Sequence, residues 1–422
     1  MFDFLPPEII SAFRLAFGYI YDYGPIWLPL AFIVSFFNAW VYFRRSAYWQ
    51  KLGSVLLEIR LPREIFKSPA AMEIVLGAMH QTADESGWYW KYWKGQTRSW
   101  FSLEIASFGG DVHFYVWCRK KYQTSIENHI YSQYPGVEVH EVEDYTKSYY
   151  FDPNKHNLWA CEWKLTMADP FPIKTYIDYG LNKDPKEEYK VDPLASMLEF
   201  LGSTTSGQSV WFQILIRAHV KDRSRPLPWS GAKKTKLTEF KWSEDYDAWQ
   251  DEAKEEIDKI IKKFRPEGGP VRMPTEGEKS SIEALERSIT KFPFDVGIRT
   301  IYIAEKEKYS ATYIGGIIGS FKQFGSPGSN GFSPKGWLGY FDRPWKKWFR
   351  SDEKLKPLVI EEYKLRRYFF SPYRSRYFYS KPFILNIEEL ATLFHLPGAV
   401  VGTPTLSRVP SKKSEAPSNL PT

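Results

Sequence analysis

The stretch Trp100–Cys118, WFSLEIASFGGDVHFYVWC, decides the expected fold. Apolar and polar residues alternate on both sides of Gly109-Gly110. Such alternation around a Gly-Gly pair is typical of two antiparallel strands joined by a tight turn. We therefore predict a hairpin made of strands 100–108 and 111–118.

The flanking sequence extends this hairpin into a larger unit. On its N-terminal side, SVLLEIRL at 54–61 predicts a half-buried strand, and Ser68-Pro69 begins a helix with apolar residues at helical spacing. On its C-terminal side, a helix at 121–133 and a strand at 137–142 follow. Strand, helix, hairpin, helix, strand is the order of a ferredoxin-like unit, which we expect over residues 51–150.

The same order returns with longer spacing over residues 155–332. Strands are expected at 158–167, 210–219 and 294–304, and helices at 192–201 and 311–324. The position of a fourth strand stays open. The predicted fold class is α+β: one N-terminal transmembrane helix and two tandem ferredoxin-like (βαββαβ) units, the second with a helical insertion.

The insertion covers residues 221–291. Its segment 243–264 combines dense charge with a narrow apolar stripe, which predicts a solvated amphipathic helix. Such a helix either packs on its own sheet or is offered to a partner.

The segment Ile26–Phe43, IWLPLAFIVSFFNAWVYF, carries no charge over its eighteen residues. As a helix it would span about 27 Å, close to the thickness of a hydrocarbon core. Its ends carry aromatic and then basic side chains, as membrane boundaries do. We predict a transmembrane helix over 26–45 with five membrane-anchor residues: Trp27, Trp40, Tyr42, Arg44 and Arg45.

The basic pair at 44–45 places the C-terminal side of this helix in the cytoplasm. The acidic, amphipathic segment 1–25 would then lie outside or in the interface. This predicts a single-pass protein of the inner (plasma) membrane, with most of the chain cytoplasmic. A signal peptide and a buried core helix are the alternatives, but the sequence lacks a basic region before the apolar run.

The net charge of +7 is concentrated in the C-terminal fifth of the 422 residues. There, segment 333–384 interleaves basic and aromatic side chains, which can hold phosphates and stack bases or lie on an anionic membrane. Two further explanations stay open: the segment's own fold with a solvated basic rim, and an acidic protein partner. The candidate polymer or lipid contacts are Lys346, Lys347, Arg366, Arg367, Arg374 and Arg376.

Near the C-terminus, Phe383–Gly398 reads FILNIEELATLFHLPG. Asn386 can cap a helix whose acidic first turn meets the helix dipole, and Pro397-Gly398 would end it. We predict a partner-docking helix over 385–398, with Glu388, Glu389, Leu390, Phe394 and His395 as its docking residues. The polar, Pro-rich and Ser-rich remainder, 399–422, predicts a disordered tail.

The residue patterns of common enzymes are missing. The sequence has no phosphate-binding loop and no Gly-x-Ser-x-Gly elbow. Cys118 and Cys161 stand apart, and the seven histidines show no metal-binding spacing. We expect both cysteines to be reduced thiols in strand-rich cores. We predict a chain that is not an enzyme and has no metal or other cofactor.

Several stretches carry a resemblance to a known family. They are SVLLEIRLPREIFKSPAAMEIVLGAMH, SLEIASFGGDVHFYVWCRKKYQTSIENHIYSQYPGVEVHEVEDYT, FDVGIRTIYIAEKE, GSFKQFGSPGSNGF and LNIEELATLFHLPG. Together they resemble the membrane-proximal N-terminal region of coupling-type, HerA-like ATPases of type IV secretion and conjugation systems in candidate-phyla bacteria. In those proteins an uncharacterised domain precedes a P-loop ATPase domain. This sequence resembles the platform without the motor, and no catalytic residue carries over.

The expected function is a membrane platform that docks a separately encoded P-loop ATPase for DNA or protein transfer. One alternative is a nucleic-acid-binding membrane protein that contacts DNA through 331–384. The other is a self-assembling scaffold, a homo-oligomer in the membrane. Membrane lipid is a partner in all three hypotheses.

Overall fold

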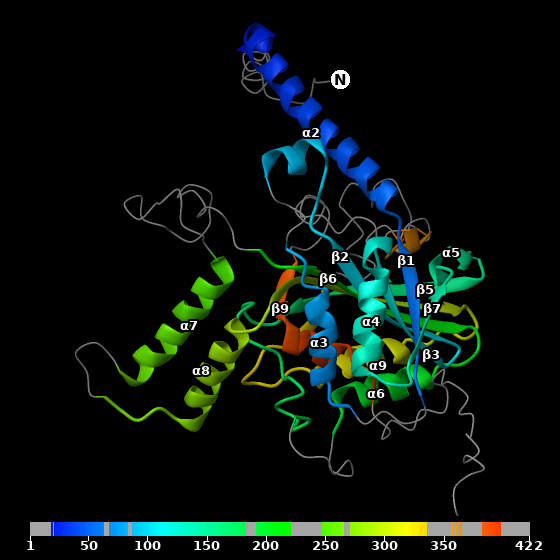
Figure 1. The fold of residues 1–422 in the computed structure, drawn as a ribbon, viewed down its shortest axis with the longest axis vertical. Helices are drawn as coiled ribbons and strands as arrows, with labels where there is room; N and C mark the ends of the chain where they lie inside the picture. The colour runs from blue at the N-terminus through cyan, green and yellow to red at the C-terminus, as the bar shows by residue number, and fades with distance from the viewer. Residues whose placement is uncertain are drawn as a thin grey trace, which may run out of the picture. The chain divides into compact units, whose positions relative to one another are not determined.

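The structure is a computed structural model (Figure 1). It describes residues 18–19, 21–62, 67–82, 87–149, 151–152, 154–182, 191–220, 247–265, 271–335, 356–357, 359–361, 363–364 and 382–397. The chain divides into two compact units. The smaller contains residues 1–53 and 83–97, and the larger contains residues 54–82 and 98–422.

The larger unit is built on one nine-stranded sheet in which the named strands pair antiparallel. The strand order is β4-β1-β3-β2-β6-β7-β5-β8, and β9 pairs with β7. The strands are β1 (Val55–Arg60), β2 (Trp100–Phe108), β3 (Asp111–Cys118), β4 (Glu138–Val142), β5 (His156–Leu165), β6 (Gln208–Ala218), β7 (Pro293–Glu305), β8 (Phe332–Lys335) and β9 (Phe383–Asn386).

The predicted hairpin is confirmed as β2 and β3, with Phe108 opposite Asp111. Its turn needs glycine, because Gly109 and Gly110 have φ angles of +64° and +97°. A Cβ atom on Gly110 would also lie 2.7 Å from the carbonyl oxygen of Thr204. The turn is therefore packed against the loop that precedes β6.

The strand order reads the same from both ends of the sheet. Strands β1 to β4 form the order β4-β1-β3-β2, and β5 to β8 form the mirrored order β6-β7-β5-β8. The two groups join along β2 and β6, where Leu103 lies opposite Ile214. The regions that we expected as two tandem domains therefore share one sheet and one compact unit. Strand β8, which the sequence analysis did not locate, pairs with β5 and ends the strand order opposite β4.

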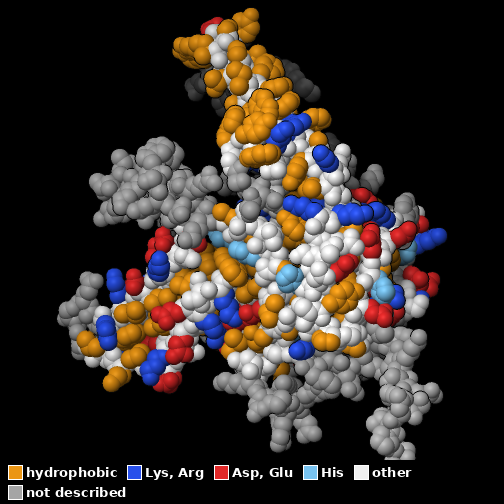
Figure 2. Space-filling model, in the orientation of Figure 1, with side chains coloured by type: hydrophobic (Ala, Val, Ile, Leu, Met, Phe, Trp, Pro, Cys, Tyr) orange, Lys and Arg blue, Asp and Glu red, His pale blue; other side chains and the backbone are white. Residues whose placement is uncertain are grey.

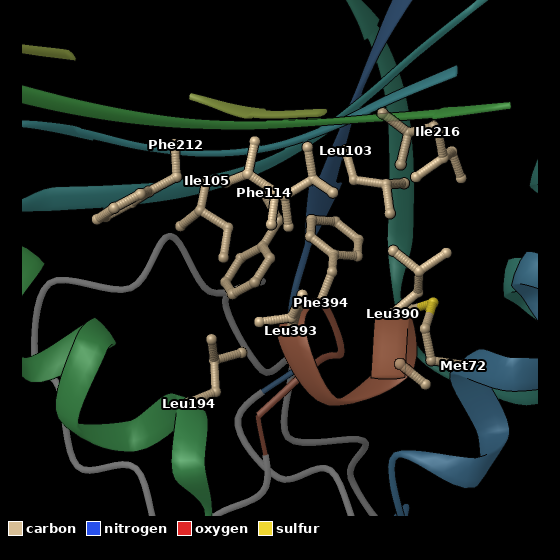
Figure 3. Packing of buried hydrophobic residues seen from close by; sticks show 14 of the residues in the cluster. Met72, Leu103, Ile105, Phe114, Leu194, Phe212, Ile216, Leu390, Leu393 and Phe394 are labelled. Atoms are coloured by element: carbon tan, nitrogen blue, oxygen red, sulfur yellow. The ribbon is translucent and has the colours of Figure 1, made fainter. Parts of the chain in front are cut away.

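Helices cover one face of this sheet. In the described part of the larger unit, the helices with defined bounds are α3 (Ala70–Ala78), α4 (Gln123–Gln133), α5 (Tyr145–Ser148), α6 (Pro193–Gly202), α7 (Ala248–Phe264), α8 (Glu276–Ile289), α9 (Thr312–Lys322) and α13 (Ile387–Leu393), and a 3-10 turn, η3 (Lys120–Tyr122), precedes α4. Buried residues of α3, α4, α6, α9 and α13 form one hydrophobic cluster with the strands. Figure 3 shows part of this cluster, in which Leu194 and Met72 face side chains of α13 and of the sheet.

The opposite face of the sheet is also buried, and it combines aromatic and aliphatic side chains such as Trp211 and Leu215 with polar ones. Ser102 and Glu104 of β2 and Gln213 of β6 are all fully buried. Ser102 donates a hydrogen bond to Glu104 at 2.6 Å, and Gln213 donates another at 3.3 Å. We expected half-buried strands with one solvated face, so this burial is a finding that alternation did not predict.

The side chain of Tyr145 from α5 takes part in covering this face. Its hydroxyl donates to Glu104 at 2.7 Å and lies 2.9 Å from the hydroxyl of Tyr363. Trp211 contacts both tyrosine rings. The buried carboxyl group thus gains partners from three directions, which is the condition for burying a polar group without a large cost.

Within the described part of the insertion, α7 and α8 pack against each other. Ile260, Phe264 and Leu285 form their shared buried cluster, with Phe171 against it. Asp247 caps α7 through the backbone N–H groups of Trp249 and Gln250. The predicted helix 243–264 is therefore confirmed from residue 248 onward, and its apolar stripe contacts α8. The sequence analysis did not anticipate α8.

Candidate membrane anchor and buried polar clusters

Helix α2 (Gly24–Leu52) is the main element of the smaller unit. It starts close to the predicted position but continues past residue 45 for almost two further turns. By length and composition it can span a membrane, and only 6% of its most apolar 18-residue window is buried. Figure 2 shows hydrophobic side chains covering its surface, with Lys or Arg groups further along it.

The predicted anchor residues have different environments on this helix. Trp27 and Tyr42 are exposed, as ring contacts with a headgroup layer require. Trp40 and Arg44 are half-buried, and the Arg44 guanidinium lies 5.7 Å from the centre of the Trp40 ring. Arg45 was expected at the membrane boundary, but it is buried within the protein together with its helical neighbours at 41 and 49.

A short aromatic loop covers this part of α2, and the sequence analysis missed it. We define the aromatic loop as residues 87–97, which contain WYWKYW at 88–93 and one π-helical turn, η2 (Tyr89–Trp93). Tyr92 contacts Phe37, and Trp93 contacts Trp40, with ring centres 5.7 and 5.5 Å apart. The sequence signal for this loop was the high density of aromatic residues between two glycines. These residues show neither helical nor strand periodicity, so they did not predict an element.

Hydrogen bonds fix the aromatic loop to the helix. Arg44 Nε donates to the carbonyl oxygen of Trp93 at 2.8 Å, and Trp49 Nε1 donates to Thr97 Oγ1 at 2.9 Å. Gly95 has a φ of +72°, and a Cβ atom there would lie 2.4 Å from the carbonyl carbon of Arg44. Only glycine allows this close approach of the two backbones.

The predicted docking helix is not a surface helix, which corrects our expectation. Residues 383–386 form β9, and α13 covers only Ile387–Leu393. Leu390 and Phe394 are fully buried, and the Phe394 ring meets Phe114 of β3 edge to face at 5.8 Å. Figure 3 shows both side chains directed into the core below the sheet. Their apolar character serves packing in this chain.

The acidic residues of α13 are buried as well. Glu388 pairs with Lys291 at 2.9 Å and with Arg287 at 3.4 Å, and Thr175 donates to it at 2.5 Å. Glu389 accepts the backbone N–H groups of Asn386 and Ile173. Burial raises the pKa of Glu389 to about 8, with the neighbouring Glu388 contributing in the same direction. Glu389 is therefore mostly protonated at neutral pH.

His395, which we also predicted as a docking residue, is buried too. Its Nε2 lies 3.2 Å from both carboxylate oxygens of Asp192, the N-cap residue of α6. Burial alone would lower the pKa of His395, but the Asp192 carboxylate outweighs it and the pKa is raised. This contact ties the end of α13 to the start of α6.

A second charged cluster lies where β6 meets β7. Asp295 is buried and accepts two hydrogen bonds from Arg217, the shorter at 2.6 Å, while Arg98 lies 3.6 Å away. His219 Nδ1 lies 2.7 Å from Asp295, and its Nε2 lies 3.8 Å from Asp247. Burial opposes the charge on His219, but these two carboxylates raise its pKa to about 9. The sequence analysis did not single out this cluster.

Among the residues that the structure describes, no group of three or more His, Cys, Asp or Glu side chains could hold a metal ion. Cys118 and Cys161 are free thiols buried in β3 and β5, and burial raises the pKa of Cys118 to about 12. The candidate contacts Lys346, Lys347, Arg366, Arg367, Arg374 and Arg376 lie outside the described residues. So do segment 399–422 and most of segment 1–25.

A family comparison covers most of the sheet-bearing region. A model described as "Domain of unknown function (DUF8128)" matches residues 51–408. The chain belongs to this family. Searches among curated proteins and among solved structures found no match. The match begins at the end of α2 and includes β1 to β9 with α13, so the DUF8128 region contains the complete described sheet.

Proposed function

We propose that this DUF8128 protein is a non-enzymatic, membrane-anchored platform that positions a separately encoded P-loop ATPase in a type IV secretion or conjugation-like transfer system. The exposure of α2 is the main support for membrane attachment. Exposing an uncharged, apolar helical surface of this length to water costs much free energy, whereas exposing it to hydrocarbon costs little. Apart from the contacts of the aromatic loop with Phe37 and Trp40, the described residues leave this surface exposed.

The packing of α2 favours a retained anchor over a cleaved signal sequence. Signal peptidases cut just after the apolar run, near residue 44 in this chain. That region is helical and contains the buried residues Val41, Arg45 and Trp49, and Trp49 donates a hydrogen bond to Thr97 of the aromatic loop. Cleavage there would remove one side of a packed contact. The helix then reaches β1 after only Gly53 and Ser54.

The proposed orientation places the sheet-bearing unit in the cytoplasm. Arg44 and Arg45 follow the apolar run, while Asp22 precedes it, and basic residues favour the cytoplasmic side. A cytoplasmic location is also the one in which an ATP-driven partner would work.

We also propose that the sheet consists of two ferredoxin-like units joined edge to edge. The support is the mirrored strand order, β4-β1-β3-β2 and β6-β7-β5-β8, with α3 and α4 in the first group and α6 and α9 in the second. Joining two such units along β2 and β6 protects two strand edges from solvent. One continuous sheet gives a platform few ways to bend between its halves.

The ATPase partner is proposed from the resemblance in sequence to coupling-type ATPases. The partner surface is sought outside α13, since Leu390 and Phe394 are inside the core. Tethering to the membrane restricts the motor to two dimensions, which raises its effective concentration near a channel. The proposal therefore needs membrane attachment but no catalytic group in this chain.

The experiment that tests the anchor is extraction of native membranes with carbonate. We expect the full chain to stay in the membrane pellet, because hydrocarbon contacts are insensitive to pH and salt. Cysteines introduced singly at Tyr19 and Met273 would report orientation, since the native thiols are buried. We expect Met273→Cys to react from the cytoplasmic side and Tyr19→Cys from the opposite side.

The partner is tested by purifying the full chain from its native membranes in mild detergent. We expect a P-loop protein to accompany it and ATP hydrolysis to follow that protein. Recovery of the chain in the aqueous fraction, or ATP hydrolysis by the chain alone, would contradict the proposal.

A further inference from the structure

We infer that the aromatic loop is a second membrane contact, which lies in the lipid headgroup layer beside α2 and binds anionic phospholipid. This inference rests on the proposed anchor and adds a specific lipid-binding site to it. The loop comes from residues far from α2 in sequence but belongs to the same compact unit.

Contacts along α2 fix the level of the loop. The uncharged run of α2 ends at Phe43, and Arg44 is the first charge after it. Trp93 contacts both Trp40 and Arg44 at this position. Tyr92 contacts Phe37, about one turn deeper along the helix. The loop therefore sits where the apolar surface meets the first cation, the level that Trp and Tyr prefer in a bilayer.

The exposed rings of the loop are unusual for a surface that meets only water. Trp88 is 63% exposed, and Tyr89, Trp90 and Trp93 are each about half exposed. Trp93 contacts Trp40 of α2, and Trp88 contacts Tyr92, whose ring meets the exposed Phe37, so the two apolar surfaces are continuous. A contiguous exposed apolar surface of this kind marks an interaction site.

The polar groups of the loop suit a headgroup layer rather than hydrocarbon. Lys91 and Lys94 are its charged side chains, and residues 87–97 contain no acid. Their ammonium groups lie 5.8 Å from the Tyr92 ring centre and 5.7 Å from the Tyr89 ring centre. Ammonium groups beside aromatic rings can bind lipid phosphates while the rings lie at the boundary with the acyl chains.

Backbone hydrogen bonds within the loop make it a closed shape. Lys91 N–H donates to Gly87 O, Lys94 N–H to Tyr89 O, and Gln96 N–H to Trp90 O. A loop whose backbone groups are satisfied internally can enter a partly dehydrated layer at low cost. With Gly95 pressed against α2, the loop can meet lipid as a preformed surface.

The test uses the full chain in phosphatidylcholine vesicles with and without phosphatidylglycerol. A fluorophore is placed on one cysteine, introduced as Trp90→Cys, Phe36→Cys or Met273→Cys. Lipids with a nitroxide near the headgroup or deep in the acyl chain then quench it according to depth. We expect shallow nitroxides to quench position 90 at least about twofold more than deep ones, and the reverse at position 36. Position 273 should be unaffected.

Two further variants test the contacts themselves. Lys91→Gln with Lys94→Gln should remove the extra shallow quenching at position 90 that phosphatidylglycerol produces. Gly95→Ala should weaken quenching at position 90 and leave position 36 unchanged, because the added methyl group pushes the loop from α2.

The outcomes separate the inference from the proposed function. Deep quenching at 36 with none at 90 would overturn the inference and leave the anchor intact. No quenching at 36 would overturn both. Protection of position 90 in detergent, together with the mass of a dimer, would assign the loop to a second copy of the chain and overturn the lipid assignment.

Discussion

Helices α2 and α13 are opposite in composition and opposite in environment. Helix α2 has a long uncharged surface that stays exposed, whereas α13 has two adjacent acids and is completely buried. Charge alone therefore does not place a short helix at a surface. Glu388 and Glu389 are buried because cations, a hydroxyl and backbone N–H groups surround them. The long apolar part of α2 has no comparable cover among the described residues.

The largest expected effect comes from matched phenylalanine substitutions on these two helices. Phe394→Ala should destabilise the folded chain by about 3–5 kcal/mol, because it opens a cavity beside Phe114 in the core. Phe36→Ala should change stability little, since that ring is exposed. Chemical unfolding of both variants in detergent measures the difference. Equal losses of stability in the two variants would contradict the assignment of α13 as buried and α2 as exposed.

A charge in the apolar part of α2 tests the other side of the comparison. Ile33→Arg should make membrane insertion less favourable by about 3 kcal/mol, because a guanidinium at the centre of a bilayer is costly. The measurement is the inserted fraction after cell-free synthesis with membrane vesicles, with Ile33→Leu as control. Insertion of the arginine variant at the level of the leucine variant would argue against a spanning helix.

The burial of Glu389 in α13 makes the stability of the chain depend on pH. The pKa of Glu389 is about 8 in the folded chain, above the ordinary value of 4.5, so the folded state retains its proton over this range. Its contribution to stability is complete below pH 4.5 and is lost as pH rises through 8. His219, with a pKa raised to about 9, contributes below pH 6.5 and loses that contribution as pH rises through 9.

Both groups therefore predict that stability falls as pH rises, between about pH 4.5 and 8 for Glu389 and between about pH 6.5 and 9 for His219. The slope from Glu389 should approach about 1.4 kcal/mol per pH unit within its window. Glu389→Gln should flatten the curve of unfolding free energy against pH. Glu278→Gln is the matched control, because Glu278 occupies the same place in the exposed capping box of α8 and has a pKa lowered to about 2 by Arg272. Identical slopes between about pH 4.5 and 8 in the unmodified protein and both variants would contradict the burial of Glu389.

The smallest effect compares the two N-caps of these capping boxes. Asn386→Ala should cost about 1–2 kcal/mol, because it leaves the buried N–H of Glu389 without its acceptor and removes the bond to Ser288. Thr275→Ala, in the exposed box of α8, should cost about 0.5–1 kcal/mol, since water replaces its hydroxyl. Thermal unfolding of both variants tests the order, and a larger loss for Thr275→Ala would reverse it.

The sequence predicted those elements whose signal is local. The alternation in 100–118 located the β2–β3 hairpin, and helical spacing located α3, α4, α6 and α9 with small boundary errors. The uncharged run from Ile26 to Phe43 located α2, although the helix continues to Leu52. Local periodicity determines which segments form strands and helices, and these features depend on little else.

The remaining features depend on contacts between distant residues. Pairing of β2 with β6 joins segments about a hundred residues apart, and no local pattern reports such pairing. Burial of Glu389 requires Ile173 as a donor, and burial of His395 requires Asp192. The aromatic loop has no regular period and becomes meaningful only when Gly95 meets the backbone of α2. The docking prediction for 385–398 failed because amphipathic helices pack inward as readily as they bind partners.

The mirrored strand order has a practical consequence for engineering. The link between the second and third strands is a two-residue turn in the first half, at Gly109-Gly110, and residues 219–292 in the second half. The same topological position therefore accommodates either a minimal turn or a whole helical hairpin without loss of strand pairing. A fluorescent or affinity module inserted between Ala218 and Pro293 would replace the natural insertion between β6 and β7. We expect the sheet to tolerate this replacement, because the strands already pair around a large insertion there.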